Sequence, residues 1–201
     1  MSGCDCHNEA GHIGQRRVLI TLLLVNAAMF FLEFAMGLIG QSTGLIADSL
    51  DMLADATVYG LALYAVGRSL ADKVRAAHVS GVLQIALAVG VILDVSRRFI
   101  LGSEPESTLM MLIGTVALAA NISCLAMLAR HRKGEIHMRA SWIFSKNDVL
   151  ANLGVMLSGA LVAWLGSPLP DLLIGLVIAV MVMTGGLSII RQANQTDAGA
   201  T

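Results

Sequence analysis

The chain has 201 residues, of which 56% are hydrophobic and 13% are charged, and its mean hydropathy is +0.76. Soluble domains are about 25% charged, so this composition argues against a water-soluble domain and indicates an integral membrane protein. The net charge of −1 gives no sign of nucleic-acid binding. The three cysteines are odd in number, and Cys4 and Cys6 are too close for a structural disulfide, so a disulfide scaffold is not expected.

The N-terminal segment is polar, and we predict that residues 1–16 form a cytoplasmic tail. It lacks the basic start of a cleavable signal peptide, so the first hydrophobic run is expected to be retained. The tail carries Cys4, Cys6, His7 and His12, whose side chains bind borderline and soft metals. We expect this cluster to capture metal ions, although exposed tails also collect polar residues without such a role.

Six segments are apolar enough to cross a bilayer as helices, which takes about 20 residues each. They are residues 18–40, 43–67, 78–101, 108–129, 139–165 and 169–190. The second and fifth are interrupted by aspartates, and the fifth also contains Lys146. The connections are short, so no second domain is expected between the spans. The sequence therefore predicts an all-α integral membrane protein in which residues 17–191 form a six-helix transmembrane bundle.

An even number of spans places both termini on one side of the membrane, and the basic residues indicate which side. The terminal side carries Arg16, Arg17, Arg68, Lys73, Arg75, Arg130, Arg132, Lys133, Arg139 and Arg191. The opposite side carries Arg97 and Arg98. By the positive-inside rule both termini are predicted to face the cytoplasm. We expect a multi-pass protein of a bacterial inner membrane, with residues 192–201 as a short cytoplasmic tail.

Polar side chains form a stripe on the first two spans. Asn26 and Glu33 lie two helical turns apart, and Asp48, Asp51 and Asp55 fall within a wedge of about 60°. A charged group inside a bilayer costs at least a few kcal/mol, so such residues normally face the bundle interior and mark a function. We therefore expect the second span to turn its aspartates inward.

The fifth span has a matching stripe of Ser141, Ser145, Asp148 and Asn152, and the third span adds Gln84. Counted from the span ends, Asp51 and Asp55 of the second span and Asp148 and Asn152 of the fifth reach the middle of the bilayer. Oxygen atoms gathered at one depth are typical of a cation site. Helix association through hydrogen bonds is the alternative. It remains open for Asn26 and the serines, but it does not suit three acids that repel each other.

Two aspartates fall outside this layer. Asp94 and Asp171 lie toward the outer ends of their spans, where we expect a wet, structural role. The small-residue stretch MTGG in the sixth span is expected to allow close helix packing.

The stretches NAAMFFLEFAMGLIGQSTGLIADSLDMLADA and NDVLANLGVMLSGALV resemble the cation diffusion facilitator family over nearly the whole membrane part. The resemblance implies a homodimer that exports divalent metals from the cytoplasm in exchange for protons. It also implies a tetrahedral transport site built from two residues on the second span and two on the fifth, each pair four residues apart. Asp51 and Asp55 match the first pair, and Asp148 matches the second member of the other.

Two features depart from the family pattern. Phe144 occupies the position where zinc transporters of the family usually have His, so Asn147, Asn152, Ser145 or water is expected to supply the fourth ligand. The chain also has a short tail where most members continue into a cytoplasmic metal-binding domain, so we expect a short form without that domain. Asp48, with Glu33 and Asn26 beside it, is expected to be an accessory group that stages the ion or carries a proton.

The predicted function is secondary transport of a divalent cation, which would be a substrate and not a cofactor. The N-terminal Cys and His residues favour zinc, cadmium or cobalt, whereas an oxygen-rich site favours Mn(II) or Fe(II); we rank zinc first. A passive cation channel and a membrane-embedded metal sensor are the alternatives. A channel would show a continuous polar stripe or repeated weak sites. An enzyme is not expected, because the sequence has no nucleophile–base pair and no phosphate-binding loop.

Overall fold

The computed structural model describes residues 4–65, 69–129 and 136–198, and the side chains of residues 4–15, 62, 65, 136–144 and 197–198 are outside the description. This part of the chain contains six helices and no strand. The helices are α1 (Cys4–Ile39), α2 (Thr43–Ala65), α3 (Leu70–Leu101), α4 (Ser107–Ala129), α5 (Ile136–Leu165) and α6 (Leu169–Ala198). The all-α prediction is confirmed.

Several helices are longer than the membrane spans predicted for them. Helix α1 begins at Cys4, so most of the predicted N-terminal tail is helical, and α6 continues into the predicted C-terminal tail as far as Ala198. Helix α3 begins at Leu70, where Ser69 accepts a hydrogen bond from the amide of Asp72 and caps the helix. The candidate metal-capture residues lie in the first turns of α1, and their side chains are outside the description.

Five of the described helices are long and apolar enough to cross a membrane, and α2 is not one of them. Helix α2 differs because Asp48, Asp51 and Asp55 interrupt its apolar sequence. It nevertheless contacts each of the other five helices. Asp48 and Asp55 are buried among them, and Asp51 is half-buried. The chain is an integral, multi-pass membrane protein with one polar helix at its centre.

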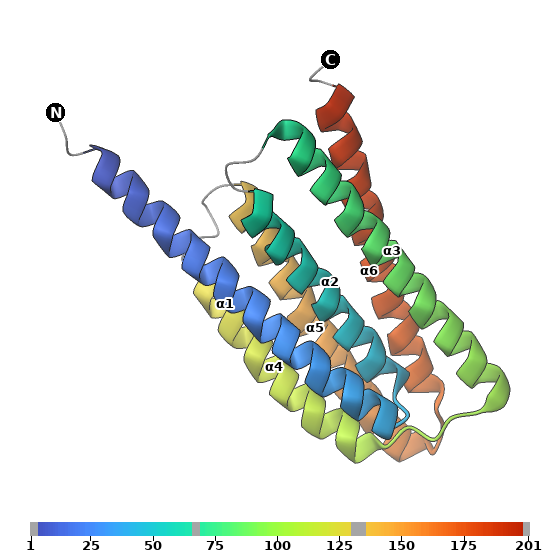
Figure 1. Ribbon diagram of the computed structural model, residues 1–201. Helices are drawn as coiled ribbons and strands as arrows, with labels where there is room; N and C mark the ends of the chain where they lie inside the picture. The colour runs from blue at the N-terminus through green and yellow to red at the C-terminus, as the bar shows by residue number, and fades with distance from the viewer. Residues whose placement is uncertain (1–3, 66–68, 130–135, 199–201) are drawn as a thin grey trace.

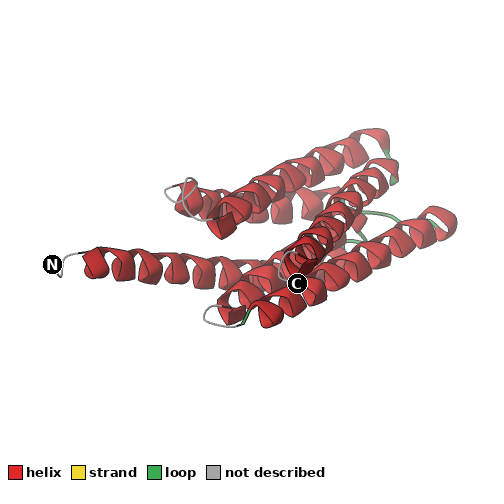
Figure 2. Ribbon diagram, turned by 90° about the horizontal axis from the view of Figure 1, so that it is seen from above, coloured by secondary structure: helices red, strands yellow, loops and turns green. Residues whose placement is uncertain are grey.

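The helices run up and down the bundle and are joined by short loops (Figures 1 and 2). Helices α3 and α6 lie side by side and contact each other, while α1 packs on α2 and α4 packs on α5. The start of α1 and the end of α6 lie at the same end of the bundle (Figure 1). This end is the one that the sequence predicts to be cytoplasmic.

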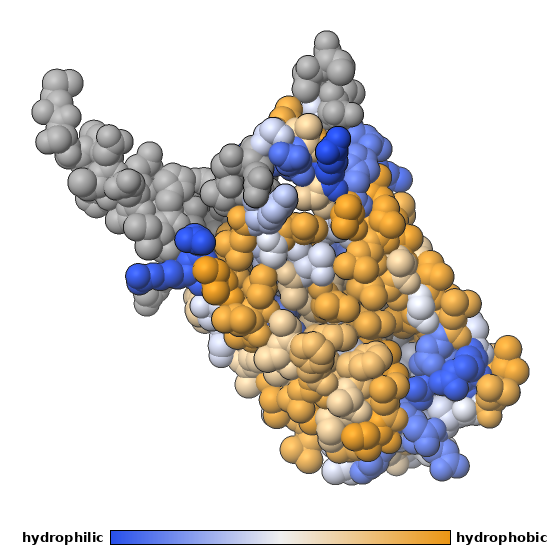
Figure 3. All heavy atoms as spheres, in the orientation of Figure 1, coloured by the Kyte–Doolittle hydropathy of each residue, from blue (hydrophilic) through white to orange (hydrophobic). Residues whose placement is uncertain are grey.

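The outer surface is apolar, and the interior holds buried polar and charged side chains alongside an apolar core. Figure 3 shows a broad apolar surface along the bundle with hydrophilic patches near its ends. Phe31 and Trp164 are 70% and 80% exposed, whereas Glu33 and Asp48 are fully buried. A surface of this kind is stable against lipid acyl chains and not against water.

Asp171 of α6 caps the N-terminus of α2. Its Oδ1 accepts hydrogen bonds from the Ser42 hydroxyl at 2.7 Å and the Gly44 amide at 2.9 Å, and its Oδ2 accepts one from the Thr43 amide at 2.6 Å. The prediction of a wet role for Asp171 is wrong, because the side chain is fully buried. The first amides of a helix lack partners within the helix and favour a negative charge, and Asp171 meets both needs.

Helix α3 contacts the turn at the same end of α2 through Arg98. Arg98 is buried and donates to the backbone carbonyl of Gln41, in the turn before α2. Asp94 accepts from Arg98 at 2.6 Å and from Arg97 at 2.8 Å. The prediction for Asp94 is consistent with this arrangement, since it forms ion pairs at the outer end of α3. The α1–α2 turn therefore forms hydrogen bonds with both α3 and α6.

Helices α3 and α6 approach each other at backbone distance. A Cβ atom added to Gly81 would lie 2.8 Å from the carbonyl oxygen of Gly186, and one added to Gly186 would lie 2.8 Å from that of Gly81. The MTGG stretch therefore permits close packing, as predicted. Side chains further along α3 are held at a fixed position relative to α6.

Candidate cation-binding site

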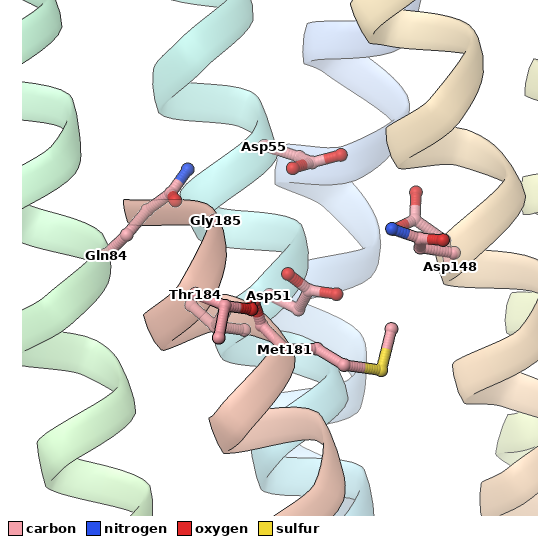
Figure 4. A pocket seen from close by; sticks show the side chains of 9 residues that line it. Asp51, Asp55, Gln84, Asp148, Met181, Thr184 and Gly185 are labelled. Carbon is pink, nitrogen blue, oxygen red and sulfur yellow. Dashed lines mark hydrogen bonds between the residues drawn. The ribbon is translucent and has the colours of Figure 1, made fainter. Parts of the chain in front are cut away.

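A cavity of about 210 Å³ lies between four helices of the bundle and is partly open to the surroundings, since Thr184 in its lining is exposed. It is lined by Asp51 and Asp55 from α2, Gln84 from α3, Asn147 and Asp148 from α5, and Met181, Val182, Thr184 and Gly185 from α6. Figure 4 shows most of these side chains around the cavity. One water molecule occupies roughly 30 Å³ of liquid, so the cavity has room for a cation together with water.

Helical spacing brings the acids of α2 to the cavity. Asp51 and Asp55 are one turn apart, so both project to the same side of the helix. Asp55 is 3% exposed, and its Oδ2 accepts a hydrogen bond of 3.4 Å from the Tyr59 hydroxyl. Asp148 is 4% exposed and enters from α5. Three carboxyl groups thus border one small interior space.

These carboxyl groups border the cavity without converging on one point. No three His, Cys, Asp or Glu side chains among the described residues are grouped closely enough to hold one metal ion. Ionised carboxyl groups repel each other strongly at low dielectric. The chemistry available to the cavity is therefore that of carboxyl and amide oxygens facing a shared space, which favours a cation over an anion.

The structure does not bring Asn152 to this cavity. Asn152 lies one turn beyond Asp148, is fully buried, and donates from Nδ2 to the carbonyl oxygen of Asp148 at 2.8 Å. Asn147, the other candidate for the fourth ligand on α5, does line the cavity. Ser145 is buried but is not part of the lining, and the side chains of Phe144 and Ser141 are outside the description.

The accessory acids form a second, deeper group. Glu33 of α1 and Asp48 of α2 are 0% and 1% exposed and do not line the cavity. Their carboxyl groups lie within hydrogen-bonding reach of each other, and no N–H or O–H group of any other described residue donates to either of them. Two carboxyl groups can hydrogen-bond only if one of them carries a proton. Asn26 is also buried and donates to the carbonyl oxygen of Leu22 at 2.9 Å.

Gln84, Met181 and Thr184 line the cavity but were absent from the sequence-predicted site. Gln84 was recognisable as a polar residue in an apolar span, but the sequence does not indicate which helix faces α2. Met181 and Thr184 gave no signal, because single Met and Thr residues are common in membrane helices. All three belong to the α3 and α6 side of the cavity.

Residues 19–195 match the model of the cation efflux transmembrane domain. The chain belongs to the cation efflux family. A relative from Bacillus velezensis, named "Cadmium, cobalt and zinc/H(+)-K(+) antiporter", is 24% identical over 203 residues. A relative of the same name from Bacillus subtilis is 22% identical over 203 residues. Each comparison covers 93% of this chain and 64% of the relative.

Membership in the cation efflux family confirms the resemblance to the cation diffusion facilitators. It also places the chain among transporters and not among enzymes, as predicted. The cation efflux chain spans slightly less than two thirds of the length of these relatives, 64% in each case.

Proposed function

We propose that this cation efflux domain exports divalent metal cations from the cytoplasm. The observation that carries the proposal is the cavity bordered by Asp51, Asp55 and Asp148 at the centre of a membrane bundle. Placing three ionised acids together inside a membrane protein, without a cation or protons, would be strongly unfavourable. A cation that binds between α2 and α5 offsets this repulsion and is released when the cavity opens to the other side.

The proposed ligands are Asp51, Asp55 and Asp148, with Asn147 as a further oxygen ligand. Asn152 is proposed as a support for Asp148 because its amide group bonds the backbone of that residue. The accessory pair of Glu33 and Asp48 is proposed to hold a proton near the ion. Both lie within the protein interior, so a proton there would be shielded from water.

Zinc is the first proposed substrate, with cadmium and cobalt next, and these are the metals in the names of both relatives. Zinc accepts carboxylate oxygen as well as nitrogen and sulfur. Manganese and iron(II) are the alternative substrates. The proposed ligands Asp51, Asp55, Asp148 and Asn147 all offer oxygen atoms, and oxygen ligands suit these harder ions. A competition assay with purified protein decides between the two sets.

Protons are proposed as the coupling ion. A metal cation and protons compete for the same carboxyl groups, so metal binding displaces protons and proton binding displaces metal. An inward proton gradient then drives metal outward. The names of both relatives describe exchange with protons and potassium, which supports antiport over a passive channel.

The termini are proposed to face the cytoplasm of a bacterial cell, with the protein as a homodimer in the inner membrane. Cys4, Cys6, His7 and His12 would then lie on the side from which metal is taken, at the start of α1. Their role would be to raise the local concentration of metal before transport.

The experiment is metal transport by purified protein in proteoliposomes that contain a fluorescent metal indicator. Transport should be fast with a proton gradient of the correct direction and slow without it. Transport that is equally fast with and without a gradient would favour a passive channel. Metal binding with no transport under any gradient would favour a sensor.

A further inference from the structure

Gln84 is a buried amide on α3 that lines the cavity and belongs to neither of the helices that carry the acids. Its side chain points toward the cavity (Figure 4), and the residue is only 4% exposed. Its amide group forms no hydrogen bond with any residue that the structure describes. An amide at this position is stabilised when an ion or an ion-bound water fills the cavity.

Gly185 of α6 gives this amide its space. A Cβ atom added to Gly185 would lie 3.3 Å from Oε1 of Gln84, which is tighter than an ordinary van der Waals contact. One residue further on, Gly186 packs against the backbone of Gly81 on α3. The close packing of α3 on α6 therefore fixes the height of Gln84, and the glycine beside it leaves its amide oxygen unobstructed.

We propose that Gln84 is a further ligand of the transported cation and supplies its amide oxygen from α3 to the ion held by Asp51, Asp55 and Asp148. This proposal rests on the proposed function and names a donor for the coordination position that Phe144 does not match. Amide oxygens are ordinary ligands of hard and borderline divalent cations. An ion bound in this way would connect the α3–α6 pair with α2 and α5.

The ligand atom that residue 84 supplies should affect which metal the site prefers. A neutral amide oxygen is a ligand that manganese accepts as well as zinc, whereas an imidazole nitrogen shifts the preference of a site toward zinc. Replacing the amide by imidazole should therefore change the order of metals. Removing the amide should weaken binding of all of them, since the three carboxyl groups remain but one ligand is lost.

The test uses the purified full chain in detergent and titrates Mn²⁺ and Zn²⁺ separately against a fluorescent metal indicator. Gln84→Ala should bind both ions at least about tenfold more weakly than wild type. Gln84→His should raise the preference for Zn²⁺ over Mn²⁺. Ser80→Ala is the matched control, because Ser80 is also a buried polar residue of α3, one turn away, but does not line the cavity. It should bind as wild type does.

Two results would overturn the proposal in distinguishable ways. If Gln84→Ala binds as wild type while Asp55→Ala does not bind, Gln84 is not a ligand and the proposed function stands. If wild type binds neither ion, the proposed function fails together with this inference. If the alanine variant does not fold, Gln84→Glu replaces it, because glutamate has nearly the same size as glutamine. A folded Gln84→Glu variant that binds both ions with wild-type affinity would then overturn the proposal.

Discussion

The cap that Asp171 places on α2 can be tested by removing it. Asp171→Ala leaves the amides of Thr43 and Gly44 and the hydroxyl of Ser42 without their shared acceptor. All three donors lie at a buried helix terminus, where water does not replace the lost carboxylate. Helix α2 carries the acids of the proposed site, so loosening its outer end affects the element on which the function depends.

The expected magnitude follows from the bonds lost. Loss of an N-cap costs about 1 kcal/mol, and each buried donor left without a partner costs about 1–3 kcal/mol. Unfolded membrane segments find other partners, which reduces such values. We expect Asp171→Ala to lower the free energy of unfolding by about 3 kcal/mol, and Asp171→Asn, which keeps one carbonyl oxygen, by about half as much.

The assay is unfolding of the purified protein by titration with SDS in mixed micelles, followed by circular dichroism. Glu104→Ala is the control, because Glu104 is an exposed acid at the same end of the bundle; it should stay within about 0.5 kcal/mol of wild type. An Asp171→Ala protein as stable as the control would refute the capping role. A loss in Asp171→Asn as large as that in Asp171→Ala would show that charge matters and the remaining oxygen does not.

Two further predictions concern the metal and the protons. Phe144→His should strengthen zinc binding relative to other metals, because it adds a nitrogen donor one turn from Asp148; an unchanged order of metals in competition binding would mean that position 144 does not face the site. Adding zinc to detergent-solubilised protein in weak buffer should release protons across roughly pH 6 to 8, since metal displaces protons from the carboxyl groups. The release should shrink sharply in Asp51→Asn and Asp148→Asn, and zinc binding without release would make a uniporter the better explanation.

Helical periodicity and bilayer thickness were sufficient to predict the all-α, multi-pass class of the fold from the sequence. Asp51 and Asp55 are four residues apart, so the sequence places them on one face, and counting residues from the span ends puts Asp148 at the same depth. The structure brings all three to one cavity. Asn152 obeys the same periodicity, but its amide bonds the backbone of Asp148 and it does not reach the cavity. Periodicity predicts which face of a helix a residue lies on, but it does not predict which partner the side chain binds.

The sequence could not predict contacts that depend on which helices are neighbours. Gln84 lines the cavity because α3 pairs with α6, and this pairing rests on Gly81 and Gly186. Asp171 lies near a span end, where wet surroundings are the usual expectation, yet α6 begins beside the first turn of α2 and buries it. Both cases follow from the three-dimensional packing of elements far apart in the chain.

The central claim is that Asp51, Asp55 and Asp148 together hold the transported cation. The most direct measurement is zinc transport into proteoliposomes driven by a proton gradient, for wild type and for Asp51→Ala, Asp55→Ala and Asp148→Ala at equal amounts of inserted protein. Each alanine variant should insert normally and show no transport above empty liposomes. Wild-type rates in any one of the three variants would remove that residue from the site and contradict the claim.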